Sequence, residues 1–320
     1  MPVQYGYKLA AEAFDPRELV RQARLAEEAG FDFVEISDHF HPWLDSQGHS
    51  PFAWSVLGSI AASTERIGLA TGVTCPTFRY HPAIIAQAAA TLAILSEGRF
   101  TLGLGSGERL NEHVVAAGYP SVSDRQAMLR EAIEIIRLLW SGGYHSYDGQ
   151  YLALEDARVF DLPDELPLIA VAAGGPDAAG LAADLGDAMF GTDPDRALVE
   201  AYWARSGDGP RYGEAAIAWA PDADTAARAA HETARWSLLG WKVMSELPNP
   251  ANFEEASVFV RLDDVRDNVS CGPDLAAHVE SVRAYEEAGY DRIAIMNLGP
   301  DVDGFFEFFA NELGPALTAE

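Results

Sequence analysis

Two imidazoles, a carboxylate and an indole follow a single apolar run of this sequence. The run covers residues 31–36 and predicts a buried strand, and the side chains that come after it are Asp38, His39, His41 and Trp43. Packing alone does not explain such a cluster, because each buried polar tip needs a hydrogen-bond partner. One histidine beside a carboxylate can act as a general base, with the indole as a wall of a substrate pocket.

The same segment allows two other interpretations. The spacing His39-x-His41 is known from metal sites, but a metal would need further ligands from other strand ends. Most of the remaining histidines fall in predicted helices or loops, so we expect no metal. Both histidines could also be ordinary residues of a surface loop.

Small residues and then a carboxylate end another predicted strand, residues 100–105. Ser106 and Gly107 let a planar ligand approach the backbone closely, and Glu108 is a candidate acid beside it. The spacing departs from G-x-G-x-x-G, and the Lys-Ser/Thr pair of a phosphate-binding loop is missing. Loop formation by glycine alone is the alternative.

Glycines also mark two further strand ends. Gly72, near the end of residues 67–73, indicates unusual backbone geometry or close approach of a ligand. Cys75 follows without an adjacent base, which favours buried packing over nucleophilic chemistry. Residues 172–176 read Ala-Ala-Gly-Gly-Pro and begin a helix, whose free N–H groups suit a cofactor phosphate. A simple turn is the alternative there.

Strand-like runs alternate with helical patterns along the whole chain. The predicted strands are residues 4–8, 31–36, 67–73, 100–105, 168–172, 188–192, 214–220 and 292–297. The predicted helices are residues 16–29, 81–95, 125–140, 176–185, 195–204, 222–235 and 273–288. This α/β pattern predicts a (β/α)8 barrel, a TIM barrel, as one domain over residues 1–320, with a doubly wound open sheet as the alternative.

Longer segments interrupt the alternation at residues 38–50, 106–123, 144–167 and 240–272. In a barrel, insertions after strands build the mouth of the active site at the C-terminal face. Within the third of these segments, Asp148-Gly149 lies between short alternating runs. This dipeptide predicts a β-hairpin with a type I′ turn.

Composition narrows the possible functions. The formal net charge of −27 argues against nucleic acid and against anionic membrane surfaces as partners. The sequence contains no run of about 18 apolar residues, so we expect no membrane span. Cys75 and Cys271 form neither a disulfide framework nor a metal-binding spacing, and a reducing cytoplasm is the expected compartment.

Together these motifs resemble the luciferase-like superfamily of flavin and deazaflavin barrels. The closest resemblance is to the branch of coenzyme F420-dependent dehydrogenases that includes the glucose-6-phosphate enzymes. It spans residues 5–317 and rests on residues 37–43, 76–82, 105–112 and 172–176. The resemblance implies F420 as cofactor, with FMN as the alternative, a small-molecule substrate and a homodimer.

The resemblance also implies roles for single residues. Cofactor contacts would fall on Asp38, Gly72, Val73, Ser106, Gly107, Ala172, Ala173, Gly174, Gly175 and Thr192, with a cis peptide between Gly72 and Val73. His39 would take the hydroxyl proton of an alcohol while its hydride moves to the cofactor. Glu108 would be the acid near the ring, and Trp43 would shape the substrate side.

The cations depart from the pattern of the sugar-phosphate enzymes. Residues 192–195 read Thr-Asp-Pro-Asp where those enzymes place a lysine, and residues 253–261 lack the second lysine. Arg283 matches the third cation. Because lost cations and added carboxylates disfavour a dianion, we expect a neutral alcohol, or its ketone or aldehyde, as substrate. The alternatives are a sugar-phosphate dehydrogenase, an FMN-dependent monooxygenase and a metal-dependent hydrolase.

Overall fold

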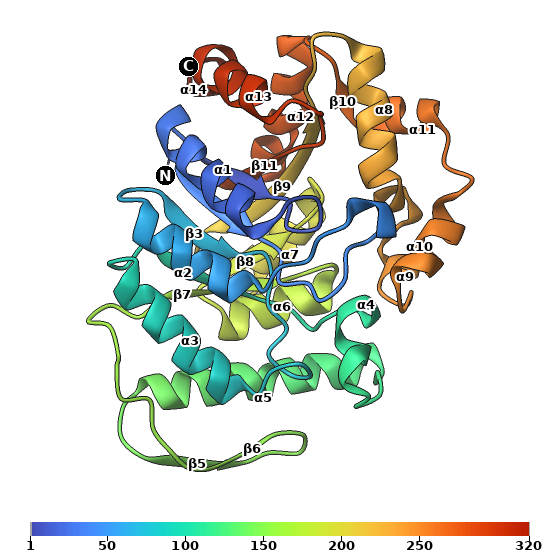
Figure 1. The fold of residues 1–320 in the computed structure, drawn as a ribbon. Helices are drawn as coiled ribbons and strands as arrows, with labels where there is room; N and C mark the ends of the chain where they lie inside the picture. The colour runs from blue at the N-terminus through green and yellow to red at the C-terminus, as the bar shows by residue number, and fades with distance from the viewer. Residues whose placement is uncertain (1, 320) are drawn as a thin grey trace.

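Eight parallel strands close into a barrel in the computed structural model, which describes residues 2–319 (Figure 1). They are β1 (Gln4–Leu9), β2 (Phe33–Ile36), β3 (Gly68–Thr71), β4 (Phe100–Leu104), β7 (Leu168–Ala172), β8 (Ala188–Gly191), β9 (Arg211–Ala218) and β11 (Arg292–Asn297). Strand β11 pairs with both β1 and β9, and β8 pairs with β9, so the sheet has no open gap. The predicted (β/α)8 fold is confirmed, and the open-sheet alternative is wrong.

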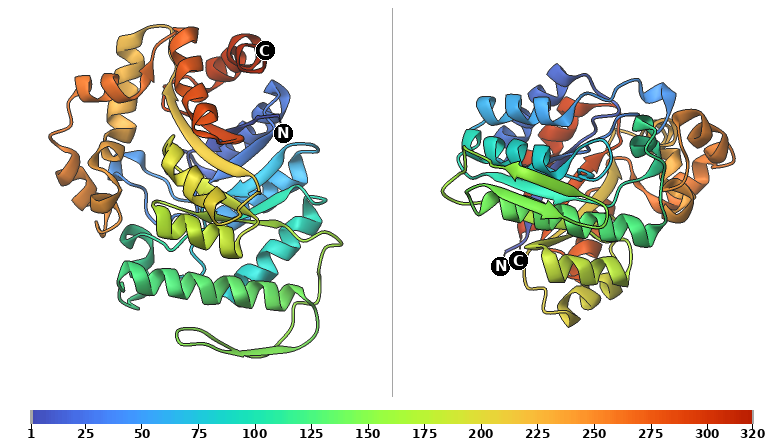
Figure 2. Two further views of the ribbon diagram at one scale, coloured as in Figure 1. Left: turned by 180° about the vertical axis from the view of Figure 1, so that it is seen from behind. Right: turned by 90° about the horizontal axis from the view of Figure 1, so that it is seen from below.

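Helices surround the barrel and shield its strands from water (Figure 2). They are α1 (Pro16–Ala29), α2 (Ala53–Ser63), α3 (Pro82–Leu95), α5 (Val122–Trp140), α6 (Pro176–Leu185), α7 (Arg196–Ala204), α8 (Ala223–Ala234) and α12 (Leu275–Ala288). At the C-terminal end, α13 (Val302–Phe308), a π-helical turn (Phe309–Leu313) and α14 (Gly314–Thr318) complete this layer. None of the helices within residues 2–319 is both long and apolar enough to cross a membrane.

Local sequence explains most of the helix boundaries. The Asp15 side chain accepts hydrogen bonds from the first backbone N–H groups of α1, Pro16 occupies its first turn, and Gly30 ends it in the left-handed conformation. Helix α2 was not predicted. Its N-cap is Phe52, whose side chain makes no capping hydrogen bond, and Gly58 lies in its middle, so its start and propensity signals are weak.

The hairpin predicted in the third insertion is present, but its turn differs. Strands β5 (His145–Asp148) and β6 (Ala153–Ala157) are joined by the four residues 149–152 rather than by a two-residue turn. The predicted type I′ turn at Asp148-Gly149 is therefore wrong, and neither residue has the positive φ that it requires. The Glu131 carboxylate on α5 holds the wider loop by accepting three of its backbone N–H groups.

The other insertions fold into short elements at the barrel mouth. They are the 3₁₀ turns Asp45–Gln47, His113–Val115 and Arg235–Leu239, the helices α4 (Arg109–Glu112), α9 (Trp241–Met244), α10 (Pro250–Ser257) and α11 (Leu262–Asn268), and the short strand β10 (Ser270–Cys271). A small apolar cluster that includes Trp43, Leu110, Met244 and Phe253 joins the loops after β2 and β4 to the insertion after α8.

A buried lysine lies inside the barrel. The Lys8 ammonium on β1 is 2.8 Å from a carboxylate oxygen of Glu35 on β2, pairs with Glu214 on β9, and donates to the Gly72 carbonyl at 2.9 Å. Burial lowers the pKa of Lys8, but the two carboxylates outweigh it and raise that pKa overall. The lysine is therefore a cation that ties three strands to the residue after β3, where the Gly72–Val73 peptide is cis.

A matched pair of glycine substitutions tests how tightly the barrel strands pack compared with the outer helices. A Cβ on Gly103 in β4 would lie 1.8 Å from the backbone oxygen of Thr71, so we expect Gly103→Ala to lower the free energy of unfolding by about 3 kcal/mol. Gly58 in α2 has open space, and Gly58→Ala should raise it by up to about 1 kcal/mol. Urea unfolding followed by circular dichroism measures both. Similar effects of the two substitutions would contradict the packing described here.

Candidate active site

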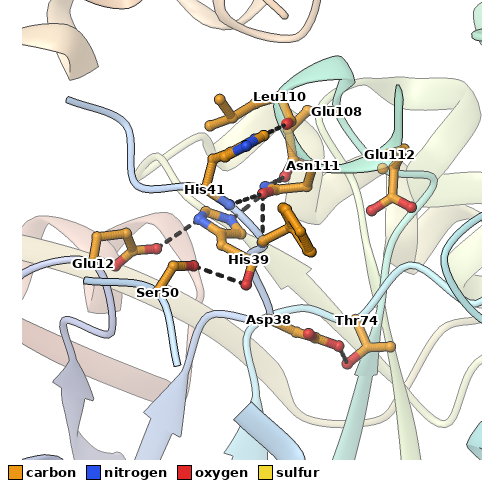
Figure 3. A network of polar contacts seen from close by, with 12 residues as sticks. Glu12, Asp38, His39, His41, Ser50, Thr74, Glu108, Leu110, Asn111 and Glu112 are labelled. Atoms are coloured by element: carbon orange, nitrogen blue, oxygen red, sulfur yellow. Dashed lines mark hydrogen bonds and ion pairs between the residues drawn. The ribbon is translucent and has the colours of Figure 1, made fainter. Parts of the chain in front are cut away.

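His39 lies between two carboxylates at the barrel mouth (Figure 3). Its Nδ1 atom is 2.6 Å from Glu12 Oε1, and its Nε2 atom is 3.5 Å from Glu108 Oε1. These residues come from the segments that follow β1, β2 and β4, and all three side chains are largely buried. The predicted pairing of His39 with Glu108 is present, and the sequence analysis did not anticipate Glu12.

The carboxylates change how this histidine titrates. Burial lowers the pKa of His39, but the attraction of Glu12, and more weakly of Glu108, raises that pKa overall. Burial alone would raise the pKa of Glu12, whereas the imidazolium of His39 lowers it. Glu12 therefore makes His39 a stronger proton acceptor than burial alone would leave it.

A buried asparagine fixes the backbone around His39. The Oδ1 atom of Asn111 accepts hydrogen bonds from the N–H groups of Phe40 at 2.7 Å and His41 at 3.0 Å, while its Nδ2 atom donates to Glu108. On the other side, the Ser50 hydroxyl donates to the His39 carbonyl at 2.9 Å. Asn111 therefore couples the position of the His39 segment to that of Glu108.

Aromatic side chains form the wall beside His39. The Trp43 ring meets the imidazole edge to face at a centroid distance of 5.0 Å, and it stacks on Trp236 at 4.1 Å. Phe253 packs on the same indole at 5.1 Å. Trp43 therefore lies beside His39 on an apolar surface, and its role toward a substrate stays a prediction.

Asp38 makes its hydrogen bonds with a different set of residues from those around His39. Its Oδ1 atom accepts from the Tyr80 hydroxyl at 2.9 Å, and its Oδ2 atom accepts from the Thr74 hydroxyl at 2.8 Å and the Trp54 indole at 3.2 Å. The guanidinium of Arg79 also contacts it. Because Asp38 is 2% exposed and its oxygens already have partners, it ties loops together in this structure, and its contact with a cofactor stays a prediction.

Arg79 also neutralises a second buried carboxylate. Its Nε atom is 3.2 Å from Glu112 Oε1. Burial raises the pKa of Glu112 to about 7, although Arg79 opposes that shift. Glu112 therefore takes up a proton more readily than an exposed glutamate does.

The glycines predicted to contact a cofactor divide into two kinds. A Cβ on Gly107, which has φ of +79°, would lie 2.8 Å from Cys75 Sγ and from Glu112 Cγ, so the loop itself requires glycine there. Gly175 has no atom within 4 Å of such a Cβ, and Gly174 has only the Trp241 indole, at 3.7 Å. The fold leaves this space free at the start of α6, where backbone N–H groups attract a phosphate.

The remaining predicted cofactor residues surround the same mouth. Val73, Ser106, Ala172, Ala173 and Thr192 follow the ends of β3, β4, β7 and β8 or end them. The Val73 side chain would be 2.7 Å from a Cβ on Gly105, so the loops after β3 and β4 are in close contact. These residues fit a planar ring with a phosphate-bearing side chain, and their contacts with one stay a prediction.

His41 does not share a ligand position with His39. Its Nδ1 atom hydrogen-bonds the carbonyl of Leu110 at 3.0 Å, and its ring is beside that of His113. Among residues 2–319, no group of three or more His, Cys, Asp and Glu side chains is arranged to hold a metal ion.

Arg283 was expected to bind substrate; its contacts in the structure are with the C-terminal segment, and the substrate role stays a prediction. It lies on α12, and its Nη2 atom donates to the carbonyls of Ala316 at 3.1 Å and Ala319 at 3.3 Å. One turn further on, Glu286 accepts from the hydroxyl of Tyr5, near the start of β1. Arg283 therefore fastens the C-terminal segment at the opposite end of the barrel from His39.

Comparisons with known proteins show the family to which the chain belongs. The luciferase-like monooxygenase family matches residues 2–292, and the chain belongs to this family. An F420-dependent glucose-6-phosphate dehydrogenase of Beutenbergia cavernae is 36% identical over 332 residues, which cover 99% of this chain and 98% of that protein. An F420-dependent hydroxymycolic acid dehydrogenase of Mycobacterium tuberculosis is 39% identical over 291 residues, which cover 89% of this chain and 80% of that protein.

A solved structure resembles the whole chain. It is an F420-dependent secondary alcohol dehydrogenase in complex with an F420-acetone adduct. The TM-score is 0.92 at 29% sequence identity, and the alignment covers all of both chains. The similar enzymes therefore share coenzyme F420 but differ in the alcohol that their names give.

The ion pair at His39 yields a direct prediction. Glu12→Gln should lower the pKa of His39 below that of an exposed histidine, because burial then outweighs the attraction of Glu108. Glu108→Gln should lower it less, since the distance to Glu108 is longer. Titration of the imidazole by NMR measures both values. Equal shifts of the His39 pKa in the two variants would contradict the stronger interaction with Glu12 that the distances indicate.

Proposed function

We propose that this protein is an F420-dependent oxidoreductase that transfers a hydride between a neutral alcohol and the deazaflavin, yielding the ketone or aldehyde. The observation that carries this proposal is His39 between Glu12 and Glu108 at the barrel mouth. Family membership and the F420-dependent relatives support the choice of cofactor. The bound cofactor would supply the site that accepts or returns the hydride.

The residues of the mouth supply the proton chemistry. In the oxidation direction, the Nε2 atom of neutral His39 takes the hydroxyl proton as the carbinol C–H bond breaks. Glu12 holds the imidazolium that results, at Nδ1. Glu108, which Asn111 orients, supplies an acid on the cofactor side. Gly174 and Gly175 would hold the phosphate, and the Gly72–Val73 bulge would support the ring.

The charges around the mouth favour a neutral substrate. The arginines of the neighbouring insertion are already paired, Arg235 with Glu254 at 3.5 Å and Arg261 with Asp264 at 2.7 Å. Residues 192–195 after β8 add two carboxylates and no cation. Recruiting a paired arginine would leave its carboxylate without a partner, which further weakens binding of a sugar phosphate.

The apolar wall favours an alcohol with a hydrocarbon substituent. Trp43, Trp236, Phe253 and Met244 belong to one cluster beside the base, and burying a substituent there gains about 25 cal/mol per Å² of apolar area. We also propose that the protein works as a homodimer, since the outer face of α3 exposes Ile84, Ile94 and Leu95.

Equilibrium binding tests the choice of cofactor. Fluorescence titration should show tight binding of oxidised F420 and much weaker binding of FMN. His39→Ala should bind F420 almost as well as the parent protein but oxidise alcohols about 10²- to 10⁴-fold more slowly, because only the general base is lost. Tighter binding of FMN would instead indicate a monooxygenase, and unchanged turnover of the variant would remove His39 from the mechanism.

A substrate panel tests the class of alcohol. With F420 bound, kcat/KM should be higher for secondary alcohols with longer hydrocarbon chains than for glucose 6-phosphate. Trp236→Ala should raise KM for the apolar alcohols, because it removes the ring that stacks on Trp43. Efficient turnover of glucose 6-phosphate would establish the sugar-phosphate alternative that the relatives' names suggest.

A further inference from the structure

One buried arginine contacts both of the loops that carry the proposed base and acid. Arg79 lies in the segment between β3 and α3, and its side chain is 7% exposed. Its acidic partners are Asp38, which directly precedes His39, and Glu112, which lies one helical turn after Glu108 (Figure 3). Arg79 therefore reaches the base and the acid through their neighbours in the chain.

The guanidinium of Arg79 donates in two directions. Toward the loop after β2, Nη2 donates to the backbone carbonyl of Asp38, and both Nη1 and Nη2 are 3.5 Å from Asp38 Oδ1. Toward α4, Nε donates to Glu112 Oε1 at 3.2 Å, and the backbone N–H of Arg79 donates to Glu112 Oε2 at 3.3 Å. The Tyr80 hydroxyl accepts from Nη1 at 3.3 Å. The planar fork therefore spans the space between the two loops, which the single ammonium of a lysine cannot do.

These contacts add a second link to the one that Asn111 makes. Asn111 joins the backbone just after His39 to Glu108, whereas Arg79 joins the carbonyl just before His39 to the residue that follows Asn111. Both carboxylates that Arg79 contacts are at most 2% exposed, so water does not readily replace the guanidinium as their partner. The segment of His39 is therefore held on both sides, at a separation of 3.5 Å between His39 Nε2 and Glu108 Oε1.

We infer that Arg79 is a positioning residue, which holds the loops of His39 and Glu108 at the separation that the proton chemistry requires. The inference rests on the proposed function for the identity of that chemistry. The spacing of the two side chains is a property of the protein alone and can be followed without cofactor. A misplacement of about 1 Å can slow an enzyme about 10²-fold, so a residue that acts only through its neighbours can still change turnover.

A charge-conserving substitution separates the shape of the guanidinium from its charge. Arg79→Lys keeps the positive charge but cannot reach Asp38 and Glu112 together. Arg99→Lys is the matched control, because Arg99 is also partly buried and donates to two backbone carbonyls, before β3 and before β4, at 2.8 Å each. Both substitutions should lower the free energy of unfolding, but only Arg79→Lys removes contacts at the mouth.

The first readout is NMR titration of the His39 imidazole in the protein without cofactor. The charged groups that act on this histidine are Glu12, Glu108 and Lys8, and neither variant changes them. Burial lowers the pKa of His39 and the two carboxylates raise it, so looser contacts should lower that pKa in Arg79→Lys. Arg99→Lys should leave it unchanged. A role in stability alone would not distinguish the two variants in this way.

The second readout is steady-state kinetics with F420 and an alcohol. Arg79→Lys should lower kcat about tenfold and change KM by less than about twofold, because the base and the acid shift while the aromatic wall stays in place. Arg99→Lys should keep the parental kcat. If Arg79→Lys does not fold, Tyr80→Phe removes one uncharged partner of Arg79 and should produce the same two changes at a smaller size.

The outcomes distinguish this inference from the proposed function. A folded Arg79→Lys with the parental His39 pKa or the parental kcat would overturn the inference and leave the proposed function standing, as would an unchanged Tyr80→Phe where that variant is the one measured. Equal losses of kcat in the Arg79 and Arg99 variants would also overturn it. If the parent protein oxidises no alcohol with F420, the proposed function fails, and the titration of His39 still decides whether Arg79 holds the loops.

Discussion

The site rests on a buried ion network around Lys8, which lies inside the barrel below the mouth. Lys8 bridges β2 and β9 through Glu35 and Glu214 and donates to the Gly72 carbonyl. Burial raises the pKa of Glu35 well above its ordinary value, while Lys8 helps lower that of Glu214. Glu35 therefore takes up a proton more readily than an exposed glutamate does, which limits the cost of burying the network. Gly72 must be glycine, because a Cβ would lie 2.4 Å from Glu35.

A second group of charged side chains lies at the barrel mouth, and its charges do not balance as those around Lys8 do. There the carboxylates Glu12, Asp38, Glu108 and Glu112 outnumber the cations, since Arg79 contacts only Asp38 and Glu112. The excess negative charge raises the pKa of His39. It also makes the mouth unfavourable for a second anion close to the base. The raised pKa of His39 and the repulsion of an anion near it therefore have a common source.

The parts of the site predictable from sequence were those set by strand ends. Apolar runs fix the strands, so His39, Trp43 and Glu108 had to meet at one face. Glu12 gave no comparable signal, because it lies among alanines in a short loop and its role depends on a partner 27 positions away. The contacts of Arg283 were not predictable for a related reason. Its assignment came from a resemblance in sequence position, whereas its contacts with Ala316 and Ala319 are set by the packing of the C-terminal segment.

The structure distinguishes glycines that the fold requires from glycines that the fold alone does not explain. In sequence, the glycines after β4 and those before α6 look alike. Added side chains at Gly105 and Gly107 would collide with Val73 and Cys75, so the chain explains those glycines by itself. Gly175 has no neighbour to avoid and an extended φ of 178° that any residue can adopt, so the fold does not explain it. Open space beside the first N–H groups of a helix is what a phosphate requires, and this is the basis for proposing a cofactor phosphate at α6.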